Sequence, residues 1–323
     1  MTHPPSFLIC SERSGSNLIS TIMGTHSQIY APPPLHFGQV VFKNLHETLP
    51  RGTRSRAWEK LQAQATRRVR KLAGPEEAQI LQDWLATRNT VDPEELIRFL
   101  YLQVPSEATN KRVFIKENNL HQLLFFILNC FPDAKFVFQV RDPRDFLASA
   151  RAATAAPHGN KFGSDRGALR VWEQDQRTGL QALALLGADR VFLHRYEDLL
   201  IDSEAVVRRI CSFLGVDFEP EMLEFHKTEK ASQLADSHKQ RQNINKPLME
   251  NNFAKYRKAL TQADIRMVER PLGRLMHTFG YPLDLILLGK GAKKSRRKTS
   301  AEQSSFQRRP LLPPLDYGPS PFF

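Results

Sequence analysis

The stretch SFLICSERSGSNLIS, residues 6–20, decides how this chain folds. Its apolar run Phe7–Cys10 breaks into a loop of small polar residues around one arginine, and the sequence then turns apolar again. This pattern predicts a buried strand, a polar loop and a helix over Ser16–Thr25. Because the backbone N–H groups of such a loop and the start of the following helix point at the same place, we expect the loop to bind an anion.

The residue types in this loop suit a phosphate or sulfate group. Gly15 lets a ligand approach the backbone closely, and Arg13 supplies positive charge. Donor side chains come from Ser14, Ser16 and Asn17. The Walker A pattern G-x-x-x-x-G-K-[ST] is absent, which disfavours an ATPase or an ordinary kinase. A plain turn in which Ser14 or Ser16 caps the helix is the alternative interpretation.

Similar alternations of short apolar runs and helical patterns follow along the chain. Further strands are predicted at Arg112–Lys116, Lys135–Val140 and Arg190–Arg195. Helical patterns cover Leu120–Cys130, Pro143–Ala153 and Ser203–Leu214. Apolar strands that alternate with helices predict an α/β fold, a parallel sheet flanked by helices on both faces. In such sheets ligands bind where the strands end. The loops after the strands Phe7–Cys10 and Lys135–Val140 should therefore lie at the same edge of the sheet.

Composition narrows the class of protein. The 323 residues carry a formal net charge of +12, which favours an anionic partner. No nucleic-acid recognition motif is present, so specific nucleic-acid binding is disfavoured. Three widely spaced cysteines show no zinc-binding pattern. Cys10 and Cys130 lie in apolar runs, so we expect them to be buried thiols in a reducing compartment. Without a signal-peptide pattern or a long apolar segment, the sequence predicts a cytoplasmic protein with no transmembrane segment.

The chain is expected to form one domain over residues 1–288. Residues of about 39–110 interrupt the alternation with helical spacing and basic stretches, so we interpret them as a helical insertion on the acceptor side. The polar region of about 227–258 is expected to be irregular. Residues 289–323 are rich in basic residues, Pro and Ser and are predicted to be a disordered tail. This tail holds eight Lys or Arg against two acids, half of the net charge.

A second motif, FVFQVRDPRDFLASA, spans residues 136–150. A strand ends at Arg141, and Pro143 suits the first turn of a helix. Ser149 follows Arg141 by eight residues, about two helical turns, so the two side chains are predicted to hold one phosphate together. Taken alone, the motif also fits a surface cluster of Arg and Asp ahead of a helix.

Together, RSGSN in the first loop and RDPRDxxxS after a later strand resemble the nucleotide site of PAPS-dependent sulfotransferases (PAPS is 3′-phosphoadenosine 5′-phosphosulfate). The approach CFPDAKFVFQ, the segment 192–223 and the stretch NFAKYRKALT resemble the bacterial and Golgi-type branch. The resemblance covers about residues 6–285 and implies a P-loop-like fold. It also implies that Arg13, Ser14, Gly15, Ser16 and Asn17 hold the 5′-phosphosulfate, and that Arg141 and Ser149 hold the 3′-phosphate.

The resemblance implies sulfonate transfer from PAPS to a hydroxyl or amine, which needs positioning, a cation and a base but no metal. Lys116 matches the lysine that the family places at a strand end, although the following Pro is missing from IKENN. Arg13 is the second candidate cation. The segment THSQIYAPPPLHF carries Pro34 where similar bacterial enzymes often carry Glu, so we predict His36 as the general base. Weaker alternatives are His121 and His194.

Other parts of the site are implied less directly. Lys246, Tyr256 and Arg257 stand where the family closes over the adenosine and 3′-phosphate, and the two basic residues are predicted to contact phosphate. The acceptor is expected to be a small molecule, a lipid or a glycan, and the basic insertion favours an anionic one. A catalytically impaired member that still binds PAPS, and a small-molecule kinase of related fold, are the alternative functions.

Overall fold

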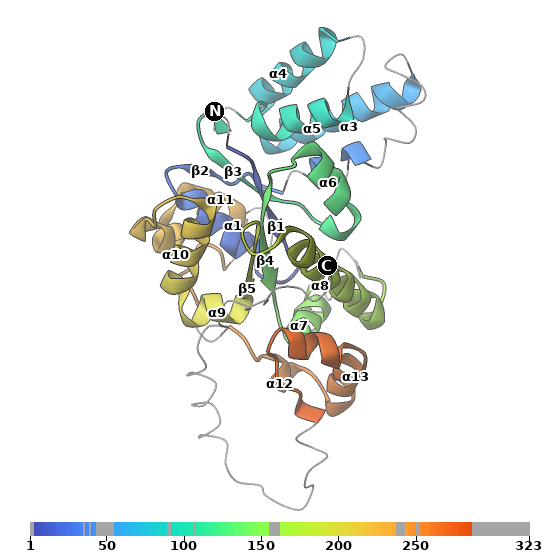
Figure 1. The fold of residues 1–323 in the computed structure, drawn as a ribbon, viewed down its shortest axis with the longest axis vertical. Coiled ribbons are helices and arrows are strands. Elements are labelled where there is room, and N and C mark those ends of the chain that lie inside the picture. Colours follow the sequence, from blue (N-terminus) through green and yellow to red (C-terminus); the bar gives the residue numbers. More distant parts are fainter. Residues whose placement is uncertain are drawn as a thin grey trace, which may run out of the picture.

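The computed structural model describes residues 3–34, 36–38, 40–42, 55–88, 92–105, 108–154, 162–236, 243–249 and 252–285. At its centre lies a five-stranded sheet of order β2-β3-β1-β4-β5 in which all neighbouring strands are parallel (Figure 1). The strands are β1 (Ser6–Ile9), β2 (Ile29–Tyr30), β3 (Arg112–Lys116), β4 (Lys135–Val140) and β5 (Val191–Arg195). This sheet confirms the predicted α/β fold and adds the two-residue strand β2.

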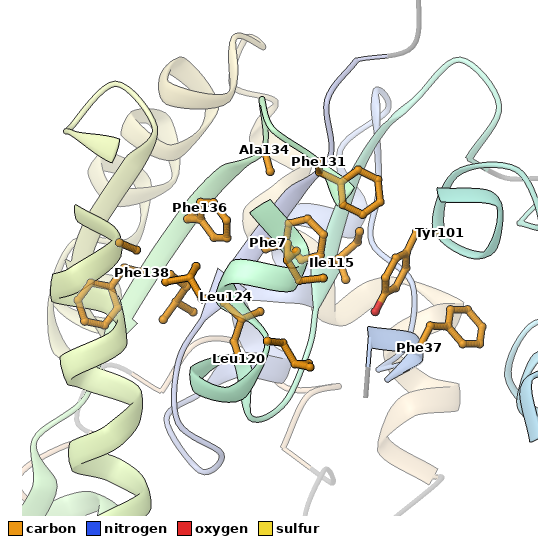
Figure 2. Packing of buried hydrophobic residues seen from close by; sticks show 14 of the residues in the cluster. Phe7, Phe37, Tyr101, Ile115, Leu120, Leu124, Phe131, Ala134, Phe136 and Phe138 are labelled. Carbon is orange, nitrogen blue, oxygen red and sulfur yellow. The ribbon is translucent and has the colours of Figure 1, made fainter. Parts of the chain in front are cut away.

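Side chains of the strands alternate between two hydrophobic cores, one on each face of the sheet. Phe7 of β1 and Phe136 of β4 stack with ring centroids 5.9 Å apart in the larger core, which Figure 2 shows. Leu8 and Val137, their next neighbours in sequence, belong to the other core. Because both faces are buried, the strands read as continuous apolar runs.

Helices cover both faces. The larger core includes side chains from α5 (Pro93–Leu102), α6 (Leu124–Cys130), α7 (Pro143–Thr154), α8 (Asp165–Leu186) and α13 (Gln262–Thr278). The smaller core includes side chains from α1 (Ser16–Thr25), α9 (Tyr196–Ile201), α10 (Ser203–Leu214) and the 3₁₀ helix η3 (Pro220–Lys227). Because β1 and β4 are parallel neighbours, the polar loops that follow them meet at the carboxyl edge, the edge of the sheet where its strands end.

Three helices of the interrupting region are described over their full length. They are α3 (Arg56–Leu72), α4 (Pro75–Ala86) and α5, of which α3 begins at the capping side chain of Ser55. Figure 1 shows these helices at the end of the molecule opposite α12 (Tyr256–Ala259) and α13. Within this group, α5 contacts the sheet, where the Tyr101 ring packs edge-on against Phe7. The basic residues Arg51 and Arg54 lie outside the described residues.

Two expected elements differ in the structure. The helix predicted over Leu120–Cys130 is a 3₁₀ turn η2 (Leu120–Gln122) followed by α6, because the backbone of Leu123 (φ −117°) departs from helical values between them. The region 227–258 is not irregular throughout, since α11 (Glu229–Asp236) and α12 lie in it. The buried residues of α11 are Ala231 and Ala235, whose small side chains give a weak hydrophobic pattern. The predicted tail, 289–323, lies outside the described residues.

Candidate functional site at the carboxyl edge of the sheet

The first loop connects β1 to α1 as a tight turn with an unusual backbone. The Ser14 N–H donates to the Ser11 carbonyl at 3.3 Å, and both Arg13 (φ 69°) and Gly15 (φ 82°) adopt the left-handed conformation. Gly15 is the residue that precedes α1, and no side chain caps this helix. The alternative of a capping Ser14 or Ser16 is therefore wrong. The first N–H groups of α1 remain available to a ligand.

Tyr196 of α9 forms the floor of this loop. A Cβ atom on Gly15 would lie 2.3 Å from Cε2 of Tyr196, so no other residue fits at position 15 without movement. The Arg141 guanidinium lies over the same ring, 4.6 Å from its centroid. The Tyr196 hydroxyl accepts a hydrogen bond from the Asn252 amide at 3.0 Å. Sequence reasoning missed Tyr196, because nothing in the pattern HRYEDLL distinguishes it from a core aromatic residue.

The two predicted loops meet through their arginines. The Arg141 guanidinium donates to the Arg13 carbonyl at 2.7 Å, and Arg13 Nε donates to Ser149 Oγ at 3.2 Å. The structure thus brings Arg13, Arg141 and Ser149 together from sites up to 136 residues apart. Burial, together with the adjacent Arg141 charge, lowers the pKa of Arg13. An anion between the two guanidiniums would relieve this repulsion.

Several buried polar atoms at this point lack a partner. Ser14 Oγ and Arg141 Nε are buried and form no hydrogen bond with any described residue. Leaving such groups unpaired costs free energy, and phosphate oxygens could accept from both. Gln139 holds the loop from below, since its side-chain amide donates to the Ser14 carbonyl. The sequence signal for this role is the glutamine inside the otherwise apolar strand KFVFQV.

A second cluster lies where β3 ends. The predicted cation Lys116 is buried, and its Nζ donates to Asn17 Oδ1 at 2.5 Å. Two residues later, the Asn118 side-chain amide donates to Glu12 Oε1 at 2.9 Å. The His36 ring lies beside Asn118, whose backbone N–H donates to His36 Nδ1 at 3.4 Å. The structure therefore places Lys116 and His36 at the same edge as the first loop.

The other candidate histidines have different surroundings. His121 Nδ1 lies 2.7 Å from Asp175 Oδ1 on α8. Burial raises the pKa of Asp175, and the neighbouring Gln176 donates to Ser11 Oγ, which places this pair beside the first loop. His194 is different, because its burial lowers its pKa to about 4 and its Nδ1 contacts the Arg195 carbonyl. His194 is a neutral core residue.

The remaining charges of RDPRD form a buried network. Arg144 is 1% exposed and binds Asp142 at 2.6 Å and Glu269 of α13 at 2.7 Å. Asp145 accepts from the Tyr256 N–H at 2.8 Å, which fixes the start of α12 on α7. The interpretation as a surface cluster is therefore wrong. The network sets the position of Arg141, whose carbonyl also accepts from the Trp172 indole at 3.0 Å.

Glu197 joins this network from α9. Its carboxylate accepts from the Asp142 N–H at 3.0 Å and from the Tyr281 hydroxyl at 2.8 Å. Burial, followed by the nearby Asp142 charge, raises the pKa of Glu197 to about 7. Burial therefore favours the protonated form of this carboxyl under the second loop.

Lys246 and Arg257 are not brought onto the arginine pair. Lys246 is exposed and donates to Asn243 Oδ1 at 3.2 Å. Arg257 is also exposed, 3.9 Å from Asp284. Among the described residues, no group of acidic, His and Cys side chains is arranged to hold a metal ion. No helix in the described part of the chain is long and apolar enough to span a membrane.

Comparisons with known proteins agree with this geometry. A protein of Aquifex aeolicus (strain VF5) without a described function is 24% identical over 265 residues, 80% of this chain and 32% of that protein. The chain thus spans about a third of the length of this relative. The sulfotransferase domain of the Synechococcus PCC 7002 olefin synthase has a similar fold, with a TM-score of 0.63 and 24% identity over 87% of this chain and 96% of that one.

A second solved structure, the sulfotransferase domain from the curacin biosynthetic pathway, gives a TM-score of 0.60 with 19% identity over 88% of this chain and all of that one. These two structures share the fold. The sequence model of the sulfotransferase family matches residues 4–220, which include both loops, Lys116 and all five strands. On that match, the chain belongs to the sulfotransferase family.

Proposed function

We propose that this protein transfers the sulfonate group of PAPS to a hydroxyl or amine acceptor and releases PAP, the desulfated nucleotide. The observation that carries the proposal is the convergence of Arg13, Arg141 and Ser149 around a loop whose Ser14 hydroxyl is buried without a partner. Two adjacent arginines and several unused donors fit a ligand with separate phosphate groups. Membership in the sulfotransferase family supports the choice of nucleotide.

In this proposal each loop holds one end of the nucleotide. The residues from Arg13 to Asn17 bind the 5′-phosphosulfate with backbone and side-chain donors at the start of α1. Arg141 and Ser149 bind the 3′-phosphate, and Lys246 and Arg257 add positive charge from the segment that continues over Tyr196. When bound, PAPS supplies an activated sulfonate whose leaving group is a phosphate.

The cation at the reacting centre is Lys116. Its Nζ is held by Asn17 of the phosphate-binding loop, so its charge stays at the carboxyl edge. A buried cation stabilises negative charge that develops on a leaving oxygen more strongly than a solvated one does. Arg13 provides a second positive charge on the other side of the same loop.

His36 is the proposed general base, and His121 is the alternative that its contacts favour. Asn118 places its backbone N–H 3.4 Å from His36 Nδ1 and its side-chain amide nitrogen 3.5 Å from His36 Nε2, so a donor group faces each ring nitrogen of His36. In His121, the contact with Asp175 places the proton on Nδ1 and leaves the Nε2 lone pair able to accept a proton. The two assignments of the base therefore differ in which substitution, His36→Ala or His121→Ala, removes turnover.

The acceptor in this proposal is a small molecule, lipid or glycan that carries a hydroxyl or amine. Residues 1–288 form the catalytic domain, with the helices α3, α4 and α5 as an insertion. The Tyr101 hydroxyl donates to Glu117, the residue after Lys116, so α5 is the helix of this group that contacts the proposed site. The basic residues of α3, among them Arg67 and Arg70, favour an anionic acceptor.

The first test is thermal unfolding with PAP, ATP or ADP. A ligand that binds only the folded state stabilises it by about 2.7 kcal/mol at a hundredfold excess over Kd. We expect a clear rise in Tm with PAP and little with ATP. The rise should be lost in Arg141→Met and kept in Arg177→Met, a matched change on the surface of α8. No rise with PAP would reject the proposal, and a larger rise with ATP would favour a kinase.

The second test measures PAP release from PAPS with a panel of phenol, alcohol and amine acceptors. If His36 is the base, His36→Ala loses turnover and keeps the Tm rise with PAP, whereas His121→Ala stays active. The reverse result would assign the base to His121. A protein that binds PAP but turns over with none of the acceptors would support the alternative of a catalytically impaired member.

A further inference from the structure

A groove separate from the nucleotide loops lies between α8 and α13. Its volume is about 560 Å³. Both helices contact α7. The lining residues come from the first half of α8 and from most of α13: Arg166, Leu169, Arg170, Glu173, Ala263, Arg266, Met267, Arg270, Pro271 and Leu272.

Four exposed arginines line this groove in two pairs. Arg166 and Arg170 stand one turn apart on α8, and Arg266 and Arg270 stand one turn apart on α13. None of the four forms an ion pair or a hydrogen bond with a described residue. The acidic residue of the lining, Glu173, is already bound to Arg177 at 2.8 Å. The groove therefore presents four positive charges that the described residues leave uncompensated.

The separation of the two arginine pairs is fixed at one end. Arg151 of α7 binds Asp165, at the start of α8, at 2.7 Å and Asp264, in the first turn of α13, at 2.6 Å. These two ion pairs hold the starts of both helices on α7. Because the spacing is preset, a partner would not have to order the groove before binding.

Between the arginines the floor of the groove is apolar. Ala263 and Pro271 are exposed and Met267 is half-buried, whereas Leu169 and Leu272 of the lining are buried. A free phosphate would use the arginines and leave this floor exposed. A single-stranded nucleic acid would find no aromatic side chain for its bases in the lining. The basic tail of this chain has the wrong charge. An amphipathic helix with acidic residues on both sides of an apolar stripe would fit both the two arginine pairs and the apolar floor between them.

We propose that the groove between α8 and α13 binds an acidic amphipathic helix of a partner protein. The acidic side chains pair with the four arginines, and the apolar stripe covers Ala263, Met267 and Pro271. The groove shares no lining residue with the nucleotide loops, so this docking does not depend on the proposed reaction.

The test uses a synthetic, fluorescently labelled helix with a leucine stripe flanked by Glu residues one turn apart. Its controls are the same peptide with Gln at every Glu and an acidic peptide without the leucines. We expect the full-length protein to bind the first peptide at least about tenfold more tightly than either control, measured by fluorescence anisotropy at physiological salt. Equal binding of either control peptide would overturn the proposal.

Substitutions in the protein locate the binding site. Arg170→Gln with Arg266→Gln should weaken binding of the Glu peptide about tenfold. Arg98→Gln with Arg208→Gln removes the same charge from arginines that are paired with Glu94 and Glu204, outside the groove, and should change binding less than about twofold. Both double variants are surface changes, and an unchanged Tm confirms that each is folded. Equal weakening by the two double variants, or tighter binding of a DNA duplex at the same arginines, would overturn the proposal.

Discussion

At the scale of single residues, Gly15 shows how closely the first loop fits its surroundings. Its positive φ is a conformation that glycine adopts without cost, and its missing side chain makes room for the Tyr196 ring. That ring in turn supports the Arg141 guanidinium. A change at Gly15 is therefore transmitted to both loops through one aromatic side chain.

We expect Gly15→Ala to abolish the Tm rise with PAP, because the new methyl group must displace Tyr196 and with it Arg141. Gly187→Ala is the matched control. Gly187 also has a positive φ, 76°, but a Cβ there meets no atom within 4 Å. The control should cost about 1–3 kcal/mol of stability, because its backbone (φ 76°, ψ 174°) lies in a region that side chains disfavour, and should keep the Tm rise. An unchanged response to PAP in Gly15→Ala would contradict the fit described for the loop.

The buried carboxyl of Glu197 gives a pH dependence of stability. Its pKa of about 7 in the folded protein lies above the ordinary 4.5, so the folded state holds this proton more tightly than the unfolded state does. The protonated Glu197 carboxyl makes its full contribution to the free energy of unfolding below pH 4.5, and this contribution is lost as the pH rises through 7. Relative to Glu197→Gln, the wild type should lose about 3 kcal/mol of unfolding free energy over this range.

Urea unfolding at a series of pH values measures this difference. Glu173→Gln serves as the control, because Glu173 is half-buried and paired on the surface of α8. Parallel pH curves for the wild type and Glu197→Gln would show that Glu197 does not titrate in this way.

At the scale of elements, the sequence predicts best where local pattern and tertiary contact agree. The strand, loop and helix from Ser6 to Thr25 follow the prediction closely, because the strand is apolar on both faces and the loop is made of small polar residues. The predicted bounds of β4 and α7 also agree closely with the structure. The strand β2 was missed because two residues, Ile29 and Tyr30, give no periodic signal.

The site was predicted to the level of its loops but not of its supporting contacts. Arg13, Arg141 and Ser149 belong to recognisable motifs, so their meeting could be expected. Tyr196 and Asp175 come from the distant helices α9 and α8, and their roles depend on packing that no local pattern encodes. Residue spacing along the chain carries no information about contacts of this kind.

The packing of α8 on β4 can be tested at Gly179. A Cβ there would lie 2.3 Å from Cζ of the fully buried Phe138. Alanine would add about 1 kcal/mol of helix propensity, but overpacking costs about 1–3 kcal/mol, and Phe138 has no space to move. We expect Gly179→Ala to lower the unfolding free energy by about 1–2 kcal/mol, measured in urea.

Gly273→Ala in α13 is the control for this prediction. Its Cβ would make an ordinary contact of 3.4 Å with Leu283 Cδ1, so the helix-propensity gain should dominate and raise stability by up to about 1 kcal/mol. If both substitutions stabilise the protein, the contact between α8 and Phe138 is looser than described.

At the scale of the whole molecule, charge is distributed between the domain and its basic C-terminal segment. Residues 289–323 contribute eight positive and two negative residues, a net +6 of the total +12. The residues of the proposed nucleotide site all precede this segment. We expect a variant that ends at residue 288 to keep its Tm rise with PAP and to elute from heparin at lower salt. Loss of the PAP response would place part of the nucleotide site in the removed segment.

The hydrogen bond from the Trp172 indole to the Arg141 carbonyl has a practical consequence. Trp172 is fully buried beside the proposed 3′-phosphate site, while the other two tryptophans, Trp58 and Trp84, belong to α3 and α4 at the far end of the molecule (Figure 1). A shift of the Arg141 carbonyl on ligand binding would therefore change the surroundings of a single indole. With Trp58 and Trp84 replaced by Phe, the protein becomes its own optical sensor for nucleotide occupancy, without a label.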